Sequence, residues 1–239
     1  MNKYFPVGVG SFKELAATSG ERQYYFVDKT RFISDFWNSH EKALLITRPR
    51  RFGKTLLLDM CKCFFDINGR EKNKLLFENL SVAKEHPEFF NKYFGRYPVI
   101  FLTLKTIKAK TYEEALDAVH ERIIRLIKTE FLYLLESKIL SKLEVEDLRD
   151  FLTNPLNENK LKNSLLFLSG LLEKHHGQKT IILLDEYDSP IHDAFSVSPS
   201  ENRYHEVLLN FMSSFIGQTF KDNPYLERGI ITGILHISH

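Results

Sequence analysis

The chain has 239 residues, of which 43% are hydrophobic and 27% are charged, and its formal net charge at pH 7 is +2. These values are typical of a globular protein with a substantial core, and the length does not require more than one domain. The small net charge gives no strong signal for binding to nucleic acid or to a membrane surface. The composition therefore does not support nucleic acid as a partner, although it leaves one possible.

The N-terminal stretch MNKYFPVGVGSF lacks the apolar run of a signal peptide, and no apolar stretch approaches the ~18 residues of a membrane span. The two cysteines, Cys61 and Cys63, lie two residues apart in a helical pattern. They therefore point to different faces and do not line one metal site. A reducing compartment is the simplest setting for them. We expect a soluble, cytoplasmic protein with no membrane partner.

Strand and helix patterns alternate in the first part of the chain. YYFVDKT is a short strand-like piece, TRFISDFWNS indicates a short helix, and ALLIT (43–47) has the length and apolar character of a buried strand. Apolar residues recur at helical spacing from Lys54 onward, and PVIFLTL (98–104) is a second apolar run.

The middle of the chain is helical by pattern. The clearest helix is 111–137, where Thr111 and Glu114 have the spacing of a capping box. Two further helices are predicted near 143–152 and 160–175, on either side of the turn-like TNPLNEN. We expect a helical insertion at about 108–176.

The last part of the chain begins with KTIILLDEYDSPI (179–191), which reads as a buried strand that ends in acids. A flexible connection is expected at 195–203, a helix at 203–220 and a strand at 229–235 (GIITGIL). Four apolar runs separated by helices predict an α/β fold with three layers. In this fold a mostly parallel central sheet is covered by helices on both faces.

The segment LLITRPRRFGKTLLLDM contains most of a phosphate-binding loop, the Walker A pattern. Gly53, Lys54 and Thr55 supply its second half, whereas Arg48 stands where the first glycine belongs. A strand before the loop and a helix after it would aim free backbone N–H groups at a bound phosphate. Lys54 would then reach the outer phosphates, and the Thr55 hydroxyl would bind Mg²⁺. The predicted nucleotide-binding residues are Arg48, Pro49, Arg50, Arg51, Phe52, Gly53, Lys54, Thr55 and Leu56.

The missing glycine changes the loop without excluding it. Pro49 fixes φ and indicates a turn of a different shape. Arg48, Arg50 and Arg51 would add positive charge beside a polyphosphate, although a solvated basic turn explains any one of them equally well.

Two acids follow the apolar strand of TIILLDE, as in the Walker B pattern. Asp185 would hold Mg²⁺, directly or through water, and Glu186 would polarise the attacking water, with Lys54 assisting catalysis. The alternative is that both acids begin a solvated loop and that Lys54 pairs with an acid. A strand–loop–helix and a strand–Asp–Glu in one chain favour the nucleotide site.

These motifs also resemble a known family. YYFVDKTRFI, LLITRPRRFGKT, IILLDEYDSPI and IITGIL are similar, in this order, to the AAA-ATPase-like domain that usually precedes a nuclease-like domain of the PD-(D/E)XK class. The resemblance runs from about Phe5 to the end of the chain. It implies a single P-loop domain of the additional-strand type over 1–239, with an N-terminal segment at 1–40. In this topology a third strand lies between the phosphate-loop strand and the acid-tipped strand. The resemblance also implies ATP and Mg²⁺ as cofactors.

The chain departs from the family pattern near its end. The family usually has an arginine soon after the Thr-Gly strand, but here His236 stands in its place, and a histidine is mostly neutral at pH 7. The sheet of the family usually closes with a fifth strand outside the phosphate-loop strand, and the residues after Leu235 are too few for it. Either YYFVD covers that edge, or the chain is a truncated relative with weak intrinsic turnover. Asp28, Lys29 and Thr30 are assigned to packing.

Other candidate residues have a structural explanation. His175 and His176 stand at a helix end, where a positive side chain suits the helix dipole. Asp188 is expected to cap the turn at Ser189 rather than to assist a metal.

Three functions remain open from the sequence. The first is an ATP hydrolase that couples nucleotide state to an unknown partner or to an effector domain absent from this chain. The second is a nucleotide-binding regulatory or interaction module without hydrolysis. A small-molecule kinase is less favoured, because a glutamate directly after Asp185 suits activation of water.

Overall fold

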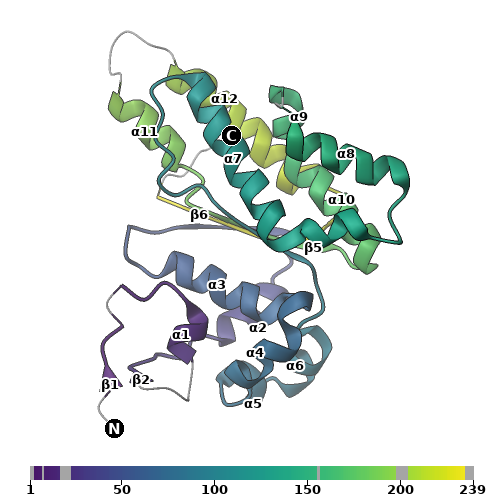
Figure 1. Cartoon of the computed structure of the whole chain (residues 1–239). Coiled ribbons are helices and arrows are strands. Elements are labelled where there is room, and N and C mark those ends of the chain that lie inside the picture. Colours follow the sequence, from purple (N-terminus) through teal and green to yellow (C-terminus); the bar gives the residue numbers. More distant parts are fainter. Residues whose placement is uncertain (1–2, 7, 17–22, 155–156, 198–203, 235–239) are drawn as a thin grey trace.

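The structure is a computed structural model that describes residues 3–6, 8–16, 23–154, 157–197 and 204–234 (Figure 1). Its main sheet has four parallel strands in the order β3-β6-β5-β4. These strands are β3 (Ala43–Thr47), β4 (Val99–Thr103), β5 (Thr180–Asp185) and β6 (Leu226–Gly233). The predicted α/β fold with a parallel sheet is confirmed. The middle strand β6 separates β3 from the acid-tipped β5, as the family resemblance implies.

Helices cover both faces of this sheet (Figure 1). One layer contains α1 (Phe12–Ala16), α2 (Arg31–Asn38), α3 (Lys54–Phe65), α4 (Arg70–Phe77), α5 (Ser81–Lys84) and α6 (Pro87–Tyr93). The other contains α7 (Tyr112–Leu126), α8 (Lys142–Thr153), α9 (Glu158–Lys162), α10 (Ser164–His176), α11 (Ser189–Val197) and α12 (Tyr204–Ile216). The three predicted layers are therefore present.

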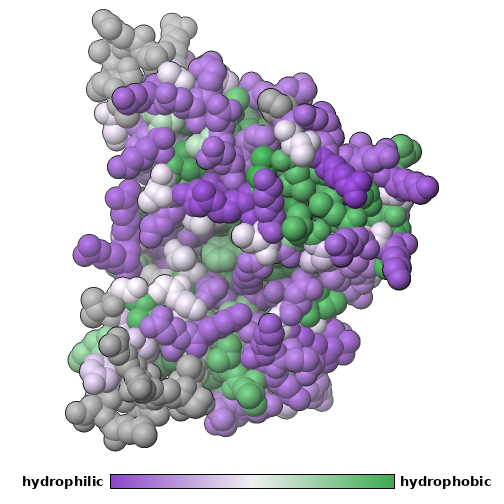
Figure 2. All heavy atoms as spheres, viewed as in Figure 1, coloured by the Kyte–Doolittle hydropathy of each residue, from purple (hydrophilic) through white to green (hydrophobic). Residues whose placement is uncertain are grey.

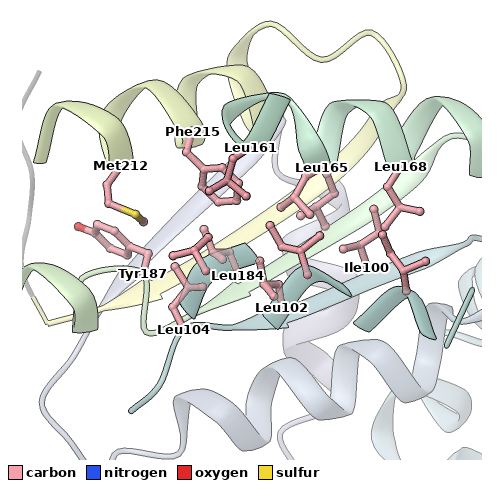
Figure 3. Close-up of a cluster of buried hydrophobic side chains, with 14 of the residues drawn as sticks. Ile100, Leu102, Leu104, Leu161, Leu165, Leu168, Leu184, Tyr187, Met212 and Phe215 are labelled. Carbon is pink, nitrogen blue, oxygen red and sulfur yellow. The ribbon is translucent and has the colours of Figure 1, made fainter. Parts of the chain in front are cut away.

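Strand β5 shows why the apolar runs are continuous rather than alternating. All six of its residues are buried. Successive side chains point to opposite faces, so Ile181 and Leu183 pack toward the layer of α3, whereas Ile182 and Leu184 pack toward the layer of α10 and α12. Figure 3 shows Leu184 in the apolar cluster between the sheet and the layer of α10 and α12, beneath Leu165 and Phe215.

Helix α3 is held at its far end by aromatic packing. Phe64 and Phe65 are fully buried, and their ring centroids lie 4.9 Å apart in an edge-to-face arrangement. Phe64 also contacts Phe77 of α4 at 5.5 Å. This anchoring fixes the direction of the helix and hence the position of Lys54 at its first turn.

Several predicted boundaries differ from the observed ones. Strand β6 begins at Leu226 because that side chain is buried and pairs with Thr180. The helix predicted at 111–137 changes to a π-helical turn at Ile127–Phe131 and then to a 3-10 turn at Leu132–Glu136. Part of the predicted connection at 195–203 belongs to α11, and the rest lies outside the described residues.

Helix ends and starts also differ from the patterns. The helix predicted at 160–175 is split at Asn163 into α9 and α10. The helix predicted at 203–220 ends as α12 at Ile216, and a π-helical turn, Gly217–Lys221, continues it. Half of the predicted capping box forms, because the Thr111 hydroxyl accepts from the Glu114 N–H at 3.2 Å. The Glu114 carboxylate accepts from the Lys110 N–H at 2.7 Å instead of from the Thr111 N–H.

The N-terminal segment does not cover the outer edge of β3, so that part of the sequence prediction is wrong. β2 (Gln23–Tyr24) pairs with β1 (Lys3–Tyr4) in a separate small sheet. The reason lies in the residues that follow. Asp28 accepts a hydrogen bond from the Ser81 N–H at 2.6 Å, and the Thr30 hydroxyl accepts from the Val82 N–H at 3.1 Å. These bonds draw the segment onto α5, and among the described residues no strand pairs with the free edge of β3.

Among the residues that the structure describes, no helix has both the length and the apolar character that crossing a membrane needs.

The histidine pair at the end of α10 is structural. His175 Nδ1 lies 2.7 Å from Ser137 Oγ, and His176 Nε2 lies 2.8 Å from the Tyr133 hydroxyl. Both contacts fasten the 3-10 turn after α7 to α10. Burial, with a smaller contribution from His175, lowers the pKa of His176 from 6.5 to about 4.

This low pKa predicts a loss of stability in mild acid. Between the unfolded pKa of His176 and its folded pKa of about 4, the unfolded chain binds the proton more readily. The free energy of unfolding should therefore fall as the pH drops from 6.5 toward 4. Urea titrations at several pH values should show a smaller fall for His176→Gln than for the wild type. The exposed His40→Gln is the control, and an equal fall in all three proteins would contradict the assignment.

Candidate functional site

The loop between β3 and α3 lies at the carboxyl end of the sheet. Its first residue continues the strand pairing, because the Arg48 N–H donates to the Gly233 carbonyl at 3.2 Å. The chain then turns through two left-handed residues, Arg51 with φ 67° and Gly53 with φ 76°. A left-handed conformation is strained for arginine, unlike glycine. The loop therefore turns at Arg51, without a glycine at position 48.

Lys54 is folded back into this loop. Its Nζ donates to the carbonyl oxygens of Arg48 at 2.6 Å and of Pro49 at 3.0 Å, and the residue is only 7% exposed. The ammonium group thus lies inside the curve of the loop, near the start of α3. A bound phosphate would have to replace these two carbonyls as its partners.

Thr55 and Asp185 meet although 130 residues separate them in sequence. The Thr55 hydroxyl donates to Asp185 Oδ2 at 2.7 Å. Thr232, at the end of the intervening strand β6, donates to Asp185 Oδ1 at 2.5 Å. Asp185 and Thr232 are both fully buried. The strand order explains this meeting, because β3, β6 and β5 end at the same edge of the parallel sheet.

These oxygens have the chemistry that Mg²⁺ prefers. A threonine hydroxyl and a carboxylate are hard ligands, and Mg²⁺ commonly takes one or two protein oxygens and fills its other positions with water and substrate phosphates. Within the described ranges, no group of three or more His, Cys, Asp or Glu side chains gathers to hold a metal. Thr55 and Asp185 therefore fit a magnesium ion that shares its coordination with a phosphate.

Glu186 follows Asp185 directly but is not buried with it. Its φ is 51°, its side chain is partly exposed, and its N–H donates weakly to Thr232 Oγ1 at 3.4 Å. The side chain lines a cleft together with Arg50 and Arg51 of the loop. The two consecutive acids thus occupy different surroundings, one buried among hydroxyls and one beside arginines.

Two clefts flank the loop. The first, the edge cleft, has a volume of about 680 Å³ and runs along the free edge of β3 and the start of α2. Its lining consists of Lys29, Arg31, Phe32, Asp35, Leu44, Leu45, Ile46, Thr47, Arg48, Phe52, Gly53, Lys54 and Leu57. The second, the basic cleft, has a volume of about 420 Å³ and lies on the Glu186 side. Its lining consists of Arg50, Arg51, Lys105, Thr106, Ile107, Lys108, Glu186, Ser189, His192, Asp193 and Ser196.

A larger hollow, of about 920 Å³, lies elsewhere, between α8, α10 and the residues before β6. Figure 2 shows hydrophobic side chains gathered over α8 and α10. This hollow is at the amino ends of the strands, since Gly177 and Tyr225 in its lining precede β5 and β6. Ligands of open parallel sheets bind at the carboxyl ends. We therefore place the site at the loop despite the smaller volumes there.

The remaining predicted site residues have different positions. Phe52 is 60% exposed beside the edge cleft. The Leu56 side chain packs against the apolar cluster under α3, which leaves only its backbone to face the loop. Asp188 is buried, accepts from the Ile234 N–H at 2.7 Å and lies 3.5 Å from His192 Nε2. His236 lies outside the described residues.

Sequence reasoning missed Thr232 and Gly233. The signal was a threonine in an otherwise apolar buried strand, GIITGIL, which requires a hydrogen-bond partner. Gly233 has a steric role, because a Cβ there would lie 2.5 Å from the Tyr187 ring and 3.0 Å from Asp188 Oδ1.

Gly233→Ala should therefore destabilise the fold at this edge of the sheet. Overpacking of this kind costs about 1–3 kcal/mol. Urea unfolding measures the loss directly. Gly217→Ala is the matched control, because a Cβ at that position meets nothing within 4 Å. Equal stability of the two variants would show that Tyr187 moves freely.

Together, a parallel sheet with β6 between β3 and β5, a basic loop before α3 and a hydrogen bond between Thr55 and Asp185 define a P-loop NTPase-like fold of three layers. The family model described as a predicted AAA-ATPase matches residues 6–239. The chain belongs to this AAA-ATPase-like family, which supports a general ATP-binding nucleotide hydrolase.

One curated relative is a longer protein than this chain. The chain is 27% identical over 214 residues to an uncharacterized protein in the vnfD 5′ region of Azotobacter chroococcum mcd 1. The match covers 88% of this chain and 34% of that protein, so the chain spans about a third of its relative's length. No solved structure matches the chain.

Proposed function

We propose that the loop 48–55 binds Mg-ATP. The observation that carries this proposal is the hydrogen bond from Thr55 to Asp185, which joins the end of the loop to the tip of β5. A magnesium ion held by these two residues would lie beside phosphates bound at the N-terminus of α3. The free N–H groups of that helix end and the Lys54 ammonium favour a polyphosphate there.

The edge cleft suits the base and ribose of the nucleotide. It begins at Gly53 and Lys54 and extends away from the loop along β3. Phe32 offers a partly buried aromatic ring, and Asp35 is exposed at its rim as a hydrogen-bond acceptor. Its volume of about 680 Å³ is within the usual range of 300–1,000 Å³ for ligand pockets.

Hydrolysis is the second part of the proposal. Glu186 follows Asp185 in sequence, is partly exposed and lines the basic cleft with Arg50 and Arg51. A carboxylate in this position can accept a proton from an attacking water, and the arginines can offset charge on the transferred phosphoryl group. Glu186 is the general base in this scheme. We also propose that hydrolysis is coupled to a partner or an effector domain.

Asp185→Asn tests the magnesium part of the site. The amide keeps one acceptor for the two threonine hydroxyls but loses the charge that attracts the metal. Calorimetric titration should show ATP affinity that depends on Mg²⁺ in the wild type and loses that dependence in the variant. The exposed Asp147→Asn controls for loss of charge alone. Retained magnesium dependence in Asp185→Asn, with an unchanged urea midpoint, would place the metal elsewhere.

A further inference from the structure

The basic cleft is built from three segments that are distant in sequence. Arg50 and Arg51 come from the loop, Lys105–Lys108 follow β4, and residues from Glu186 to Ser196 come from the end of β5 and α11. The proposed nucleotide uses only the first of these segments for its phosphates. The proposed nucleotide position leaves the part of the cleft near Lys105 and Lys108 without an assigned role.

The charge of this cleft is unbalanced. Four cationic side chains line it, against the two carboxylates of Glu186 and Asp193. Asp193 already accepts a hydrogen bond from the Ala109 N–H at 3.0 Å. Among the described residues, none of the four cations has an ion pair within 4.0 Å; the four are Arg50, Arg51, Lys105 and Lys108. The cleft therefore presents unpaired positive charge around a concave surface.

Backbone strain gathers at the same place. In the described part of the chain, the non-glycine residues with positive φ are Arg51 (67°), Thr106 (62°) and Glu186 (51°), and all of them line the basic cleft. Such conformations are unfavourable and persist where the surroundings enforce them, often at binding sites. One of them comes from each of the three segments.

The segment after β4 is fixed from both sides. Arg122 of α7 donates to the Lys105 carbonyl at 3.1 Å and to the Thr106 hydroxyl at 3.2 Å. Ile107 is buried, and the bond from Ala109 to Asp193 closes the far end. The positions of the Lys105 and Lys108 backbone are thus preformed, which lowers the entropy that binding would otherwise cost.

We propose that the basic cleft binds a second ligand, a small phosphorylated molecule, beside the position of the nucleotide's terminal phosphate. The unpaired cations suit a phosphate group. Ser189 and His192 add groups that can hydrogen-bond the hydroxyls of such a molecule. The volume of about 420 Å³ fits a small metabolite. Among the described residues, the lining contains no Phe, Tyr or Trp, which argues against single-stranded nucleic acid, whose bases stack on aromatic rings.

The test uses inorganic phosphate and glycerol 3-phosphate as probes. Each is titrated by calorimetry into protein saturated with Mg²⁺ and a non-hydrolysable ATP analogue, so that the loop is filled. We expect both probes to bind the loaded protein. The double variant Lys105→Gln/Lys108→Gln should weaken the affinity for the probes about tenfold or more, the loss of at least one charge-assisted bond. Its nucleotide affinity should stay unchanged. Lys110→Gln, which removes an exposed lysine outside the lining, should bind the probes like the wild type.

Other outcomes would overturn the proposal. Absence of probe binding, or equal binding by the double variant, would remove the site. If the probes bound the free protein but not the protein loaded with the nucleotide analogue, the cleft would only be the position of the nucleotide's terminal phosphate. Binding of an oligothymidylate through Lys105 and Lys108, without binding of the small probes, would replace it with a nucleic-acid site. This inference adds to the proposed function without requiring it, because Lys54→Ala should still bind the probes when it no longer binds nucleotide.

Discussion

Lys54→Ala should abolish measurable Mg-ATP binding while the protein remains folded. Each charge-assisted hydrogen bond that the ammonium makes to phosphate is worth roughly 1.5–3 kcal/mol, or about tenfold to a hundredfold in affinity per bond. The variant also loses the bonds from Nζ to the carbonyl oxygens of Arg48 and Pro49. Isothermal titration calorimetry measures the affinity, and thermal unfolding with and without ATP measures the linked stabilisation.

The control for this variant lies on the same helix. Lys62 pairs with Glu130 at 3.1 Å on the surface, so Lys62→Ala removes a lysine from α3 without touching the loop. It should bind Mg-ATP like the wild type. If Lys54→Ala also retained wild-type affinity, the nucleotide would have to bind away from the loop.

Glu186→Gln should slow ATP hydrolysis by about 10²–10⁴-fold, the usual contribution of a general base, and leave ATP affinity nearly intact. The Glu186 side chain lines the basic cleft and takes no part in the hydrogen bond between Thr55 and Asp185, so its neutralisation should leave the magnesium residues in place. Single-turnover phosphate release gives the rate, and calorimetry gives the affinity.

The exposed Glu206→Gln is a suitable comparison for Glu186→Gln, since it removes a carboxylate on α12 that lines neither the edge cleft nor the basic cleft. An unchanged hydrolysis rate in Glu186→Gln would reject the general base and leave the protein as a nucleotide-binding module without efficient chemistry.

The strands of the sheet could be predicted from the sequence, because parallel strands that are buried on both faces consist of continuous apolar runs. ALLIT matches β3, and TIILLD matches β5. Strand order came only with the family resemblance, since local pattern does not encode which strands are neighbours. The N-terminal strand was misplaced for the same reason, because the bonds from Ser81 and Val82 to Asp28 and Thr30 are long-range contacts.

The candidate site shows the same limit. The contact between Thr55 and Asp185 could be predicted, because Asp185 ends one strand, Thr55 follows the loop after another, and both strands end at the same edge of the sheet. The role of Lys54 at a phosphate stays a prediction. Thr232 was missed because its role exists only once β6 lies between the other two strands. The grouping of Arg51, Thr106 and Glu186 in one cleft was also inaccessible, since backbone strain is not visible in residue spacing.

A crystal structure with Mg²⁺ and a non-hydrolysable ATP analogue tests the proposed nucleotide site most directly. We expect the triphosphate inside the loop 48–55, with the Lys54 ammonium turned from the loop carbonyls to the phosphates. We also expect a magnesium ion beside the Thr55 hydroxyl and Asp185, and the base in the edge cleft. A nucleotide bound instead in the hollow between α8 and α10, with Lys54 still bonded to Arg48 and Pro49, would contradict this proposal.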